Sequence, residues 1–178
     1  WRLKQMGRLG NVPIFLDSPM AIDATQLMAA HPHDHRLDAD TCRQVFGIAR
    51  YTDDVEASKK ISTNAYPKII ISASGMATGG RVLHHLKAFA PDARNTIILA
   101  GFQAAGTRGR TLAEGGRELK IHGQWIPVNA EVAQLDMLSA HADSGELMRW
   151  LSGFKKPPRR VFIVHGEPEA SDALRVRI

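Results

Sequence analysis

Cysteine is scarce in this chain, where Cys42 is the single one among 178 residues. No disulfide can form within the chain, which excludes a disulfide-stabilised secreted scaffold. No apolar run approaches the ~20 residues of a membrane helix, and residues 1–5 lack the apolar stretch of a secretory signal. These absences together predict a cytoplasmic protein. Internal repeats and low-complexity tracts are also lacking, so a single ordinary domain, or one domain plus a piece of another, fits this length.

Basic residues are in excess, with a net charge of +5 and a pI of about 9.7. Such a balance fits a polyanionic partner, because Lys and Arg side chains neutralise phosphates and release counterions. A generally basic protein without such a partner would show the same balance. The charge alone therefore does not decide between the two.

Short apolar runs alternate with longer amphipathic ones over the first two thirds of the chain. β-branched runs predict strands, and apolar positions three to four residues apart predict helices. The expected strands are residues 13–17, 68–72 and 96–100, the last two buried, and the expected helices are residues 18–30, 38–49, 53–61, 79–89 and 107–114. Strands alternating with helices predict an α/β fold with a mainly parallel sheet flanked by helices.

The pattern changes after Gly116. Three short runs at residues 119–121, 125–128 and 132–136 predict antiparallel strands, which a helix at 144–151, a strand at 160–164 and the start of another helix follow. The final pattern is interrupted at Ile178, and the chain does not begin with Met. We therefore expect a fragment of a longer protein.

Two predicted strands lead into glycine-rich turns that precede helices, at residues 72–81 and 100–110. Glycine lets backbone N–H groups approach an anion, and Arg81 and Arg110 are placed where each could pair with a phosphate. Neither turn matches a phosphate-loop or dinucleotide motif, so a tight structural turn is the alternative. Two such turns at the carboxyl ends of neighbouring strands favour a ligand crevice.

Two histidines each follow directly on an apolar, strand-like run. These are His141, after residues 136–140, and His165, after residues 161–164. Side chains at strand ends are held rigidly yet remain open to a crevice, which suits metal ligation or proton transfer. His84 and His85 instead lie inside a predicted helix. One of them is expected near the rim of the crevice, and a hydrogen-bonded structural role is the favoured alternative for each.

Four motifs occur in a fixed order along the chain: Leu16-Asp17-Ser18-Pro19-Met20-Ala21, Ser72-Ala73-Ser74-Gly75-Met76 with Gly79-Gly80-Arg81, Ser139-Ala140-His141-Ala142-Asp143, and Val164-His165-Gly166-Glu167. Together they resemble the β-CASP branch of the metallo-β-lactamase superfamily. That branch includes ribonuclease J and the endonuclease of the cleavage and polyadenylation machinery. The bacterial and archaeal RNA-processing exonucleases are the most similar type. The ordered set spans nearly the whole chain and is more specific than any single motif.

The resemblance implies a domain organisation and a set of site residues. Residues 1–120 would form most of a β-CASP domain, and residues 121–178 the truncated segment that returns to a metallo-β-lactamase domain. His141 would contact the scissile phosphate and assist proton transfer, and His165 would ligate one of two zinc ions. A weaker correspondence places along the RNA path Ser72, Ser74, Gly75, Arg81, Gly106, Thr107 and Arg110.

The family's His-x-His-x-Asp-His run and its other metal ligands have no counterpart here. The run from His31 to His35 has one residue too few between His33 and Asp34, and we interpret it as a solvated loop, with metal binding as the less favoured alternative. Each zinc takes three or four protein ligands, so His165 cannot hold two ions. We therefore expect a zinc-dependent ribonuclease in the full-length protein, acting on single-stranded RNA, and an inactive 178-residue piece.

Two other functions fit the same residues. Some β-CASP proteins have lost their metal ligands and act as nucleic-acid-binding or scaffolding partners, and the superfamily also contains DNA nucleases. The sequence leaves open the mode of cleavage, internal or from the 5′ end, and the natural RNA target. It also leaves open the oligomeric state, a homo-oligomer included.

Overall fold

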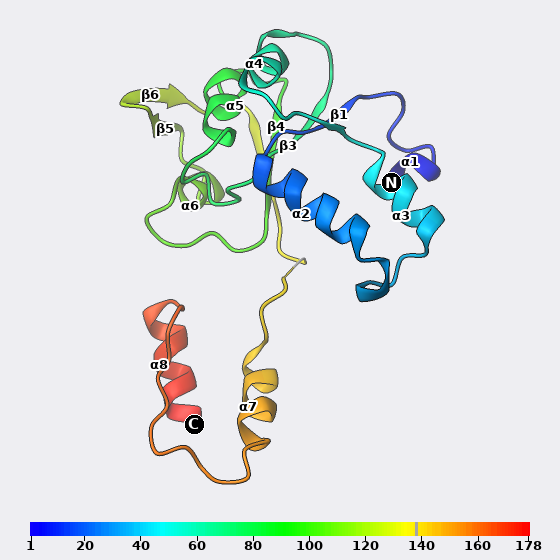
Figure 1. The fold of residues 1–178 in the computed structure, drawn as a ribbon. Coiled ribbons are helices and arrows are strands. Elements are labelled where there is room, and N and C mark those ends of the chain that lie inside the picture. The colour runs from blue at the N-terminus through cyan, green and yellow to red at the C-terminus, as the bar shows by residue number, and fades with distance from the viewer. Residues whose placement is uncertain (138) are drawn as a thin grey trace. The chain divides into compact units, whose positions relative to one another are not determined.

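The computed structural model describes residues 1–137 and 139–178, and Leu138, next to the predicted His141 motif, lies outside the described residues. The chain forms two compact units, residues 1–135 and 136–178 (Figure 1). Each unit is described by itself. No helix in the described part of the chain is long and apolar enough to cross a membrane.

Several helices of the first unit begin at a residue whose side chain caps them. Ser18 accepts a hydrogen bond from the amide of Ala21, and Asp38 and Asp54 cap the next two helices in the same way. The helices are α1 (Arg2–Gln5), α2 (Pro19–Ala30), the 3-10 helix η1 (Pro32–Asp34), α3 (Ala39–Phe46), α4 (Val55–Thr63), α5 (Val82–Phe89) and α6 (Arg108–Ala113).

The strands of the first unit pair mainly in parallel, which confirms the predicted fold class. Strand β1 (Ile14–Leu16) lies between β2 (Arg50–Tyr51) and β3 (Ile69–Ile71), parallel to both. Strand β4 (Thr96–Ala100) pairs in parallel with β7 (Glu131–Leu135). The prediction of an antiparallel strand at 132–136 was therefore wrong. The chain between β4 and β7 is long enough to return in the same direction, which a short hairpin connection could not do.

Strands β5 (Glu118–Ile121) and β6 (Gln124–Pro127) form an antiparallel hairpin, as predicted. Their inward side chains join the apolar core with residues of α5, α6 and β4. The core members include Leu83, Leu86, Leu99, Leu112, Leu119, Ile121 and Ile126. Helix α6 and strand β5 contact each other, so the core fixes the hairpin beside the second glycine-rich turn.

Two strands are less buried than the sequence predicts. Ile71 in β3 is 49% exposed and Ile98 in β4 is 61% exposed. Both strands lie at the edge of their sheets, β3 in the order β2-β1-β3 and β4 in the pair with β7. A β-branched run indicates a strand, but only the arrangement of the sheets decides how many of its faces are covered.

The second unit contains helices α7 (Ser144–Ser152) and α8 (Pro168–Arg177). The strand predicted at residues 160–164 is not formed, although these residues are described. Val161, Phe162 and Val164 are exposed. A strand needs a hydrogen-bonding neighbour, and no strand occurs among the described residues of this unit, so an apolar run alone does not produce one.

Candidate functional site

Asp17 holds the first glycine-rich turn in place through hydrogen bonds. Its side chain is fully buried at the end of β1. One carboxylate oxygen accepts a hydrogen bond from Arg81 at 2.6 Å. The other lies 2.6 Å from Ser58 Oγ and 2.6 Å from His85 Nε2. A buried carboxylate stays ionised only when such donors replace its water, so α4, α5 and the turn are all tied to one charge.

The pKa values follow from this arrangement. Burial by itself raises the pKa of Asp17, but the hydrogen bonds from Ser58, Arg81 and His85 together outweigh it and hold the pKa below its ordinary value of 3.8. Burial lowers the pKa of His85, and the contact with Asp17 opposes this without cancelling it. His85 Nδ1 lies 3.1 Å from Ser62 Oγ. A neutral imidazole that donates from Nε2 to Asp17 and accepts from Ser62 satisfies every partner. His85 is thus a hydrogen-bonded structural histidine.

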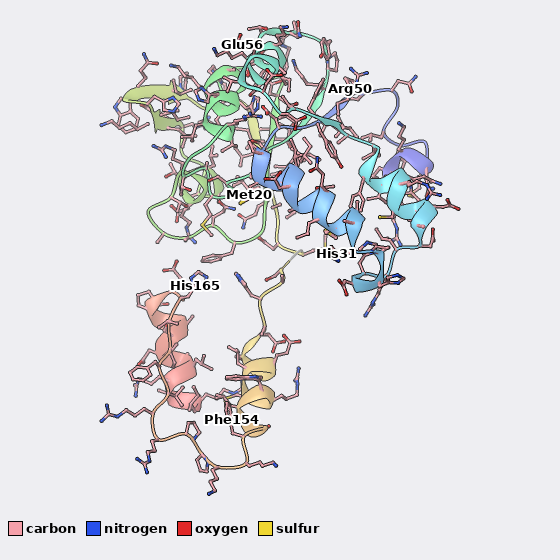
Figure 2. The ribbon with its side chains drawn as sticks, in the orientation of Figure 1. Met20, His31, Arg50, Glu56, Phe154 and His165 are labelled. Atoms are coloured by element: carbon pink, nitrogen blue, oxygen red, sulfur yellow. The ribbon has the colours of Figure 1, made fainter. Side chains whose placement is uncertain are left out.

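The first glycine-rich turn, residues 72–81, lines a pocket of about 440 Å³ that we call the serine pocket. Its walls include Ser18, Ser72, Ser74 and Arg81. Met20, in the first turn of α2, also borders it, and Figure 2 labels this side chain at the start of that helix. Predicted RNA-binding residues from one turn therefore converge with the start of α2 on one cavity.

The hydroxyls of the serine pocket are held in place by the backbone. Ser72 Oγ donates to the carbonyl of Asp17 at 2.9 Å. Ser74 Oγ accepts from the amides of Thr78 and Gly79, at 3.2 and 3.3 Å. Ser74 also has a φ of 69°, in the left-handed region that non-glycine residues rarely occupy. Such a conformation persists only where its surroundings impose it.

Arg81 is oriented by protein groups rather than left free. Besides Asp17, its guanidinium donates to the carbonyl oxygens of Thr52 and Asp53, at 2.7 and 2.9 Å. The sequence places Arg81 as a phosphate ligand. The structure places its guanidinium in an internal ion pair at the edge of the serine pocket.

The two glycine-rich turns, predicted to follow neighbouring strands, follow strands of different sheets, yet they contact each other. The amide of Gly109 donates to the carbonyl of Met76 at 2.9 Å. A Cβ at Gly109 would lie 1.8 Å from Gln103 Oε1 and 3.0 Å from Met76 Cα. Only glycine allows this close approach, so the two turns pack directly against each other.

A second pocket, of about 480 Å³, lies where the turns meet, and we call it the tryptophan pocket. Gly106 and Thr107 of the second turn line it together with Thr78 of the first. Lys120 and Trp125 of the β5–β6 hairpin complete its wall. Two of the predicted RNA-binding residues, Gly106 and Thr107, therefore border this cavity.

Two other predicted RNA-binding residues are placed differently. Arg110 is not among the residues that line either pocket, and its guanidinium pairs with Glu114 at 2.7 Å on the surface of α6. Arg108 lines the tryptophan pocket in its place. Gly75 lies in the first turn, and a Cβ there would be 3.8 Å from the carbonyl oxygen of Ala100, an ordinary contact distance.

The second unit brings together His141, the predicted catalytic residue, and His165, the predicted zinc ligand. The ring centroids of His141 and His165 lie 6.0 Å apart, in an edge-to-face arrangement. Figure 2 labels His165 shortly before α8. Its φ is 63°, again in the left-handed region.

Asp143, in the His141 motif, caps α7. It accepts a hydrogen bond from the Glu146 amide at 2.8 Å, and the Glu146 side chain accepts one from the Asp143 amide at 2.9 Å. This capping box fixes the chain direction just after His141.

These histidines do not make a complete metal site. Among the described residues, no group of three or more His, Cys, Asp or Glu side chains could hold a metal ion. Zinc takes three or four protein ligands. Two imidazoles can supply part of a zinc site, and the rest has to come from other groups.

Comparison with known families agrees with the motifs. Residues 1–112 match the Beta-Casp domain. The chain belongs to the β-CASP family. Residues 125–178 match the Zn-dependent metallo-hydrolase RNA specificity domain, and the two matches together confirm the resemblance drawn from the sequence.

Three curated relatives show how the β-CASP chain compares with longer proteins. It is 35% identical to the transcription termination factor FttA of Methanosarcina mazei over 92% of this chain and 28% of the relative. It is 34% identical to the ribonuclease TTHA0252 of Thermus thermophilus, over 94% of this chain and 39% of the relative. It is 35% identical to an RNase J-like protein of Methanocaldococcus jannaschii, over 90% of this chain and 37% of the relative. The chain thus spans between about a quarter and two fifths of these relatives.

Sequence reasoning assigned no role to four residues that shape the site. Asp17 stands in a family motif, yet nothing local shows that its carboxylate is buried. Arg108 lies in the second glycine-rich turn but was given no role there, and Lys120 and Trp125 belong to no motif. The alternation of buried and exposed positions around Gly123 could have placed Lys120 and Trp125 on one face of a hairpin. The position of Arg108 depends on the phase of a short helix, which the sequence does not define.

Proposed function

We propose that this chain is part of a cytoplasmic, zinc-dependent ribonuclease that hydrolyses phosphodiester bonds of single-stranded RNA. The observation that carries the proposal is the pairing of His141 with His165 at 6.0 Å in a chain of the β-CASP family. The match of residues 125–178 to an RNA specificity domain of zinc-dependent hydrolases supports both the metal and the substrate.

The two histidines take different roles in this proposal. His165 serves as a zinc ligand, and His141 donates a hydrogen bond to a phosphate oxygen and passes a proton to the leaving group. Zinc, when bound, acts as a Lewis acid that activates water and polarises the phosphate. The remaining ligands of two zinc ions come from other parts of a longer protein, which the lengths of the relatives support. By itself, the 178-residue piece is inactive.

The RNA strand follows the glycine-rich turns of the first unit. Ser72, Ser74 and Arg81 bind it beside the serine pocket, with Gly75 in the same turn. Gly106 and Thr107 bind it beside the tryptophan pocket, with Arg110 on the adjoining helix α6. The residues of a β-CASP domain, 1–120, supply this path, and residues 121–178 return to the metallo-hydrolase domain. The direct contact between the two turns supports one continuous path.

The test is cleavage of a labelled single-stranded RNA by the full-length protein. His141→Ala and His165→Ala should each lower the rate at least about a hundred-fold, the usual cost of removing one group that stabilises a transition state. The exposed His33→Ala is the matched control and should keep the wild-type rate. Chelation should abolish cleavage and zinc should restore it. Wild-type rates in both histidine variants would overturn the proposal.

Cleavage of a DNA oligomer of the same sequence distinguishes a ribonuclease from a DNA nuclease of the same superfamily. Cleavage of RNA but not of DNA is expected, because a 2′-hydroxyl is what distinguishes the two strands at a binding site. Equal cleavage of both would replace the ribonuclease by a general nuclease.

A second candidate is a nucleic-acid-binding module without cleavage activity. The Methanosarcina mazei relative is a transcription termination factor by name, which favours this function over a purely degradative enzyme. The same full-length protein distinguishes the two. RNA binding without zinc-dependent cleavage would support the module and exclude the ribonuclease.

A further inference from the structure

The turn and the register of the β5–β6 hairpin place a tryptophan on its exposed face. Its turn is His122-Gly123, with φ values of 48° and 79°, and two positive φ values define the two-residue turn that matches the twist of a hairpin. This turn sets the register, which pairs Lys120 with Trp125. Leu119 and Ile126, on the other face, are buried in the core. A one-residue slip would bury Lys120 and expose the core residues, so the register is firmly specified.

Trp125 is 64% exposed, although tryptophan is mostly buried on average. Lys120 Nζ lies 5.9 Å from the centroid of the indole ring, at cation–π distance. The hairpin lies at the edge of the first unit, next to α5 and α6 (Figure 1). Trp125 therefore offers a large flat surface in a cavity of about 480 Å³.

A second cation, Arg108, also lines the tryptophan pocket. Arg108 donates to the carbonyl oxygens of Lys120, Ala77 and Thr78, at 2.6, 3.2 and 3.4 Å. These carbonyls orient the guanidinium without neutralising it. Neither Arg108 nor Lys120 has a carboxylate partner among the ion pairs of the described residues. Glu118 is the acidic residue of the pocket, so the lining carries two positive charges against one negative charge.

The lining chemistry narrows the class of ligand. Apart from Trp125, the apolar side chain in the wall is Leu119, which is buried in the core. A membrane or an apolar protein surface would need several exposed apolar groups, which this pocket does not offer. An aromatic face beside two cations and the hydroxyls of Thr107 and Thr111 is instead the combination that binds single-stranded nucleic acid.

We propose that the tryptophan pocket binds one nucleotide of a single-stranded RNA, with its base stacked on Trp125 and its phosphate beside Lys120 and Arg108. This rests on the proposed action on RNA and adds a subsite to it. Gly106 and Thr107 lie in the same wall, so the subsite continues the path along the second glycine-rich turn. Stacking tolerates any base, which suits an RNA path that reads no sequence.

The experiment measures binding of a fluorescent oligouridylate to the full-length protein, without metal so that no strand is cut. Trp125→Ala should weaken binding roughly five- to 150-fold, the range for loss of one base–aromatic stack. Trp125→Phe should retain most of the affinity. Gln124→Ala, in the same strand and also exposed, is the matched control and should bind as the wild type.

An abasic oligomer of equal length separates stacking from charge. The wild type should prefer oligouridylate to the abasic strand, and Trp125→Ala should bind the two alike. Lys120→Ala should lower the slope of log affinity against log salt by about 0.7, the share of one phosphate contact in single strands, whereas Trp125→Ala should leave it unchanged.

The outcomes distinguish this subsite from the function on which it rests. Wild-type protein that binds no RNA would overturn both. RNA binding that is equal in wild type and Trp125→Ala, or an undiminished preference for bases in that variant, would overturn the subsite and leave the ribonuclease standing. A urea melt of each variant checks that it still folds. Normal folding is expected, because the buried face of the hairpin is unchanged.

Discussion

The carboxylate of Asp17 and the imidazole of His85 are joined at 2.6 Å across 68 positions of sequence, and both side chains are buried. Asp17 directly follows strand β1 of the β2-β1-β3 sheet, whereas His85 belongs to helix α5, whose Leu83 and Leu86 are members of the apolar core. The pair thus connects that sheet to the core. The first glycine-rich turn lies between them along the chain and is held at both ends, through Ser72 and Arg81.

Asp17→Asn should destabilise the protein strongly. The change leaves Arg81 without its buried partner, and removing one member of a buried ion pair costs about 3–5 kcal/mol in the free energy of unfolding. The matched control is Asp92→Asn, whose carboxylate pairs with Arg94 at the surface. Water screens that pair, so its loss should change stability far less. Urea unfolding of the two variants measures the difference, and equal midpoints would contradict the role of Asp17.

Stability should fall as the pH drops below about 6.5, the pKa of a histidine in an unfolded chain. Burial holds the pKa of His85 below that value in the folded protein. Between the two values the unfolded chain binds a proton that the folded chain does not, so acid favours unfolding. Asp17 acts in the same direction at lower pH, because its lowered pKa stabilises the fold above 3.8 and that contribution is lost as the pH falls further.

His85→Gln removes the histidine titration and provides the control. The wild type should lose more stability than this variant between pH 7.5 and 5.5, measured as the shift of the urea midpoint. A variant that loses as much stability as the wild type would assign the acid sensitivity to other groups.

Gly109→Ala should destabilise the contact between the two glycine-rich turns. The new Cβ would collide with Gln103 and press on the backbone of Met76. Overpacking of this kind costs about 1–3 kcal/mol. Gly79→Ala, where an added Cβ meets nothing within 4 Å, should leave the thermal midpoint almost unchanged. Identical melting of the two variants would show that the turns do not need their close approach.

Asp143→Ala should loosen the start of α7. The variant removes the N-cap, which contributes roughly 1 kcal/mol to a helix, whereas Asp143→Asn keeps an equally good capping side chain. Amide hydrogen exchange at Glu146 reports the change directly, because this amide donates to Asp143. Faster exchange is expected in the alanine variant alone. Similar exchange in all three proteins would exclude the cap as the element that orders the chain after His141.

Most of the helices and strands, and the family, were accessible from the sequence because they depend on local patterns, whereas α1, η1 and β2 were not predicted. Apolar spacing and capping residues such as Ser18 located the helices to within a few residues. The ordered motifs around Ser74, His141 and His165 identified the family. The apolar run at 160–164 was misread as a strand, since pairing depends on a neighbour that the run itself cannot specify.

Sequence alone determined the class of fold, the family and the residue types available for chemistry, because spacing and side-chain type are local properties. Tertiary structure alone decided which of those side chains meet. In the folded chain, Asp17 is buried and pairs with Arg81 and His85, and Arg110 pairs with Glu114. Trp125 lies beside Lys120, in the pocket where the two turns meet. Burial, hydrogen bonding and charge are properties of neighbours in space, and most of these neighbours lie far apart along the chain.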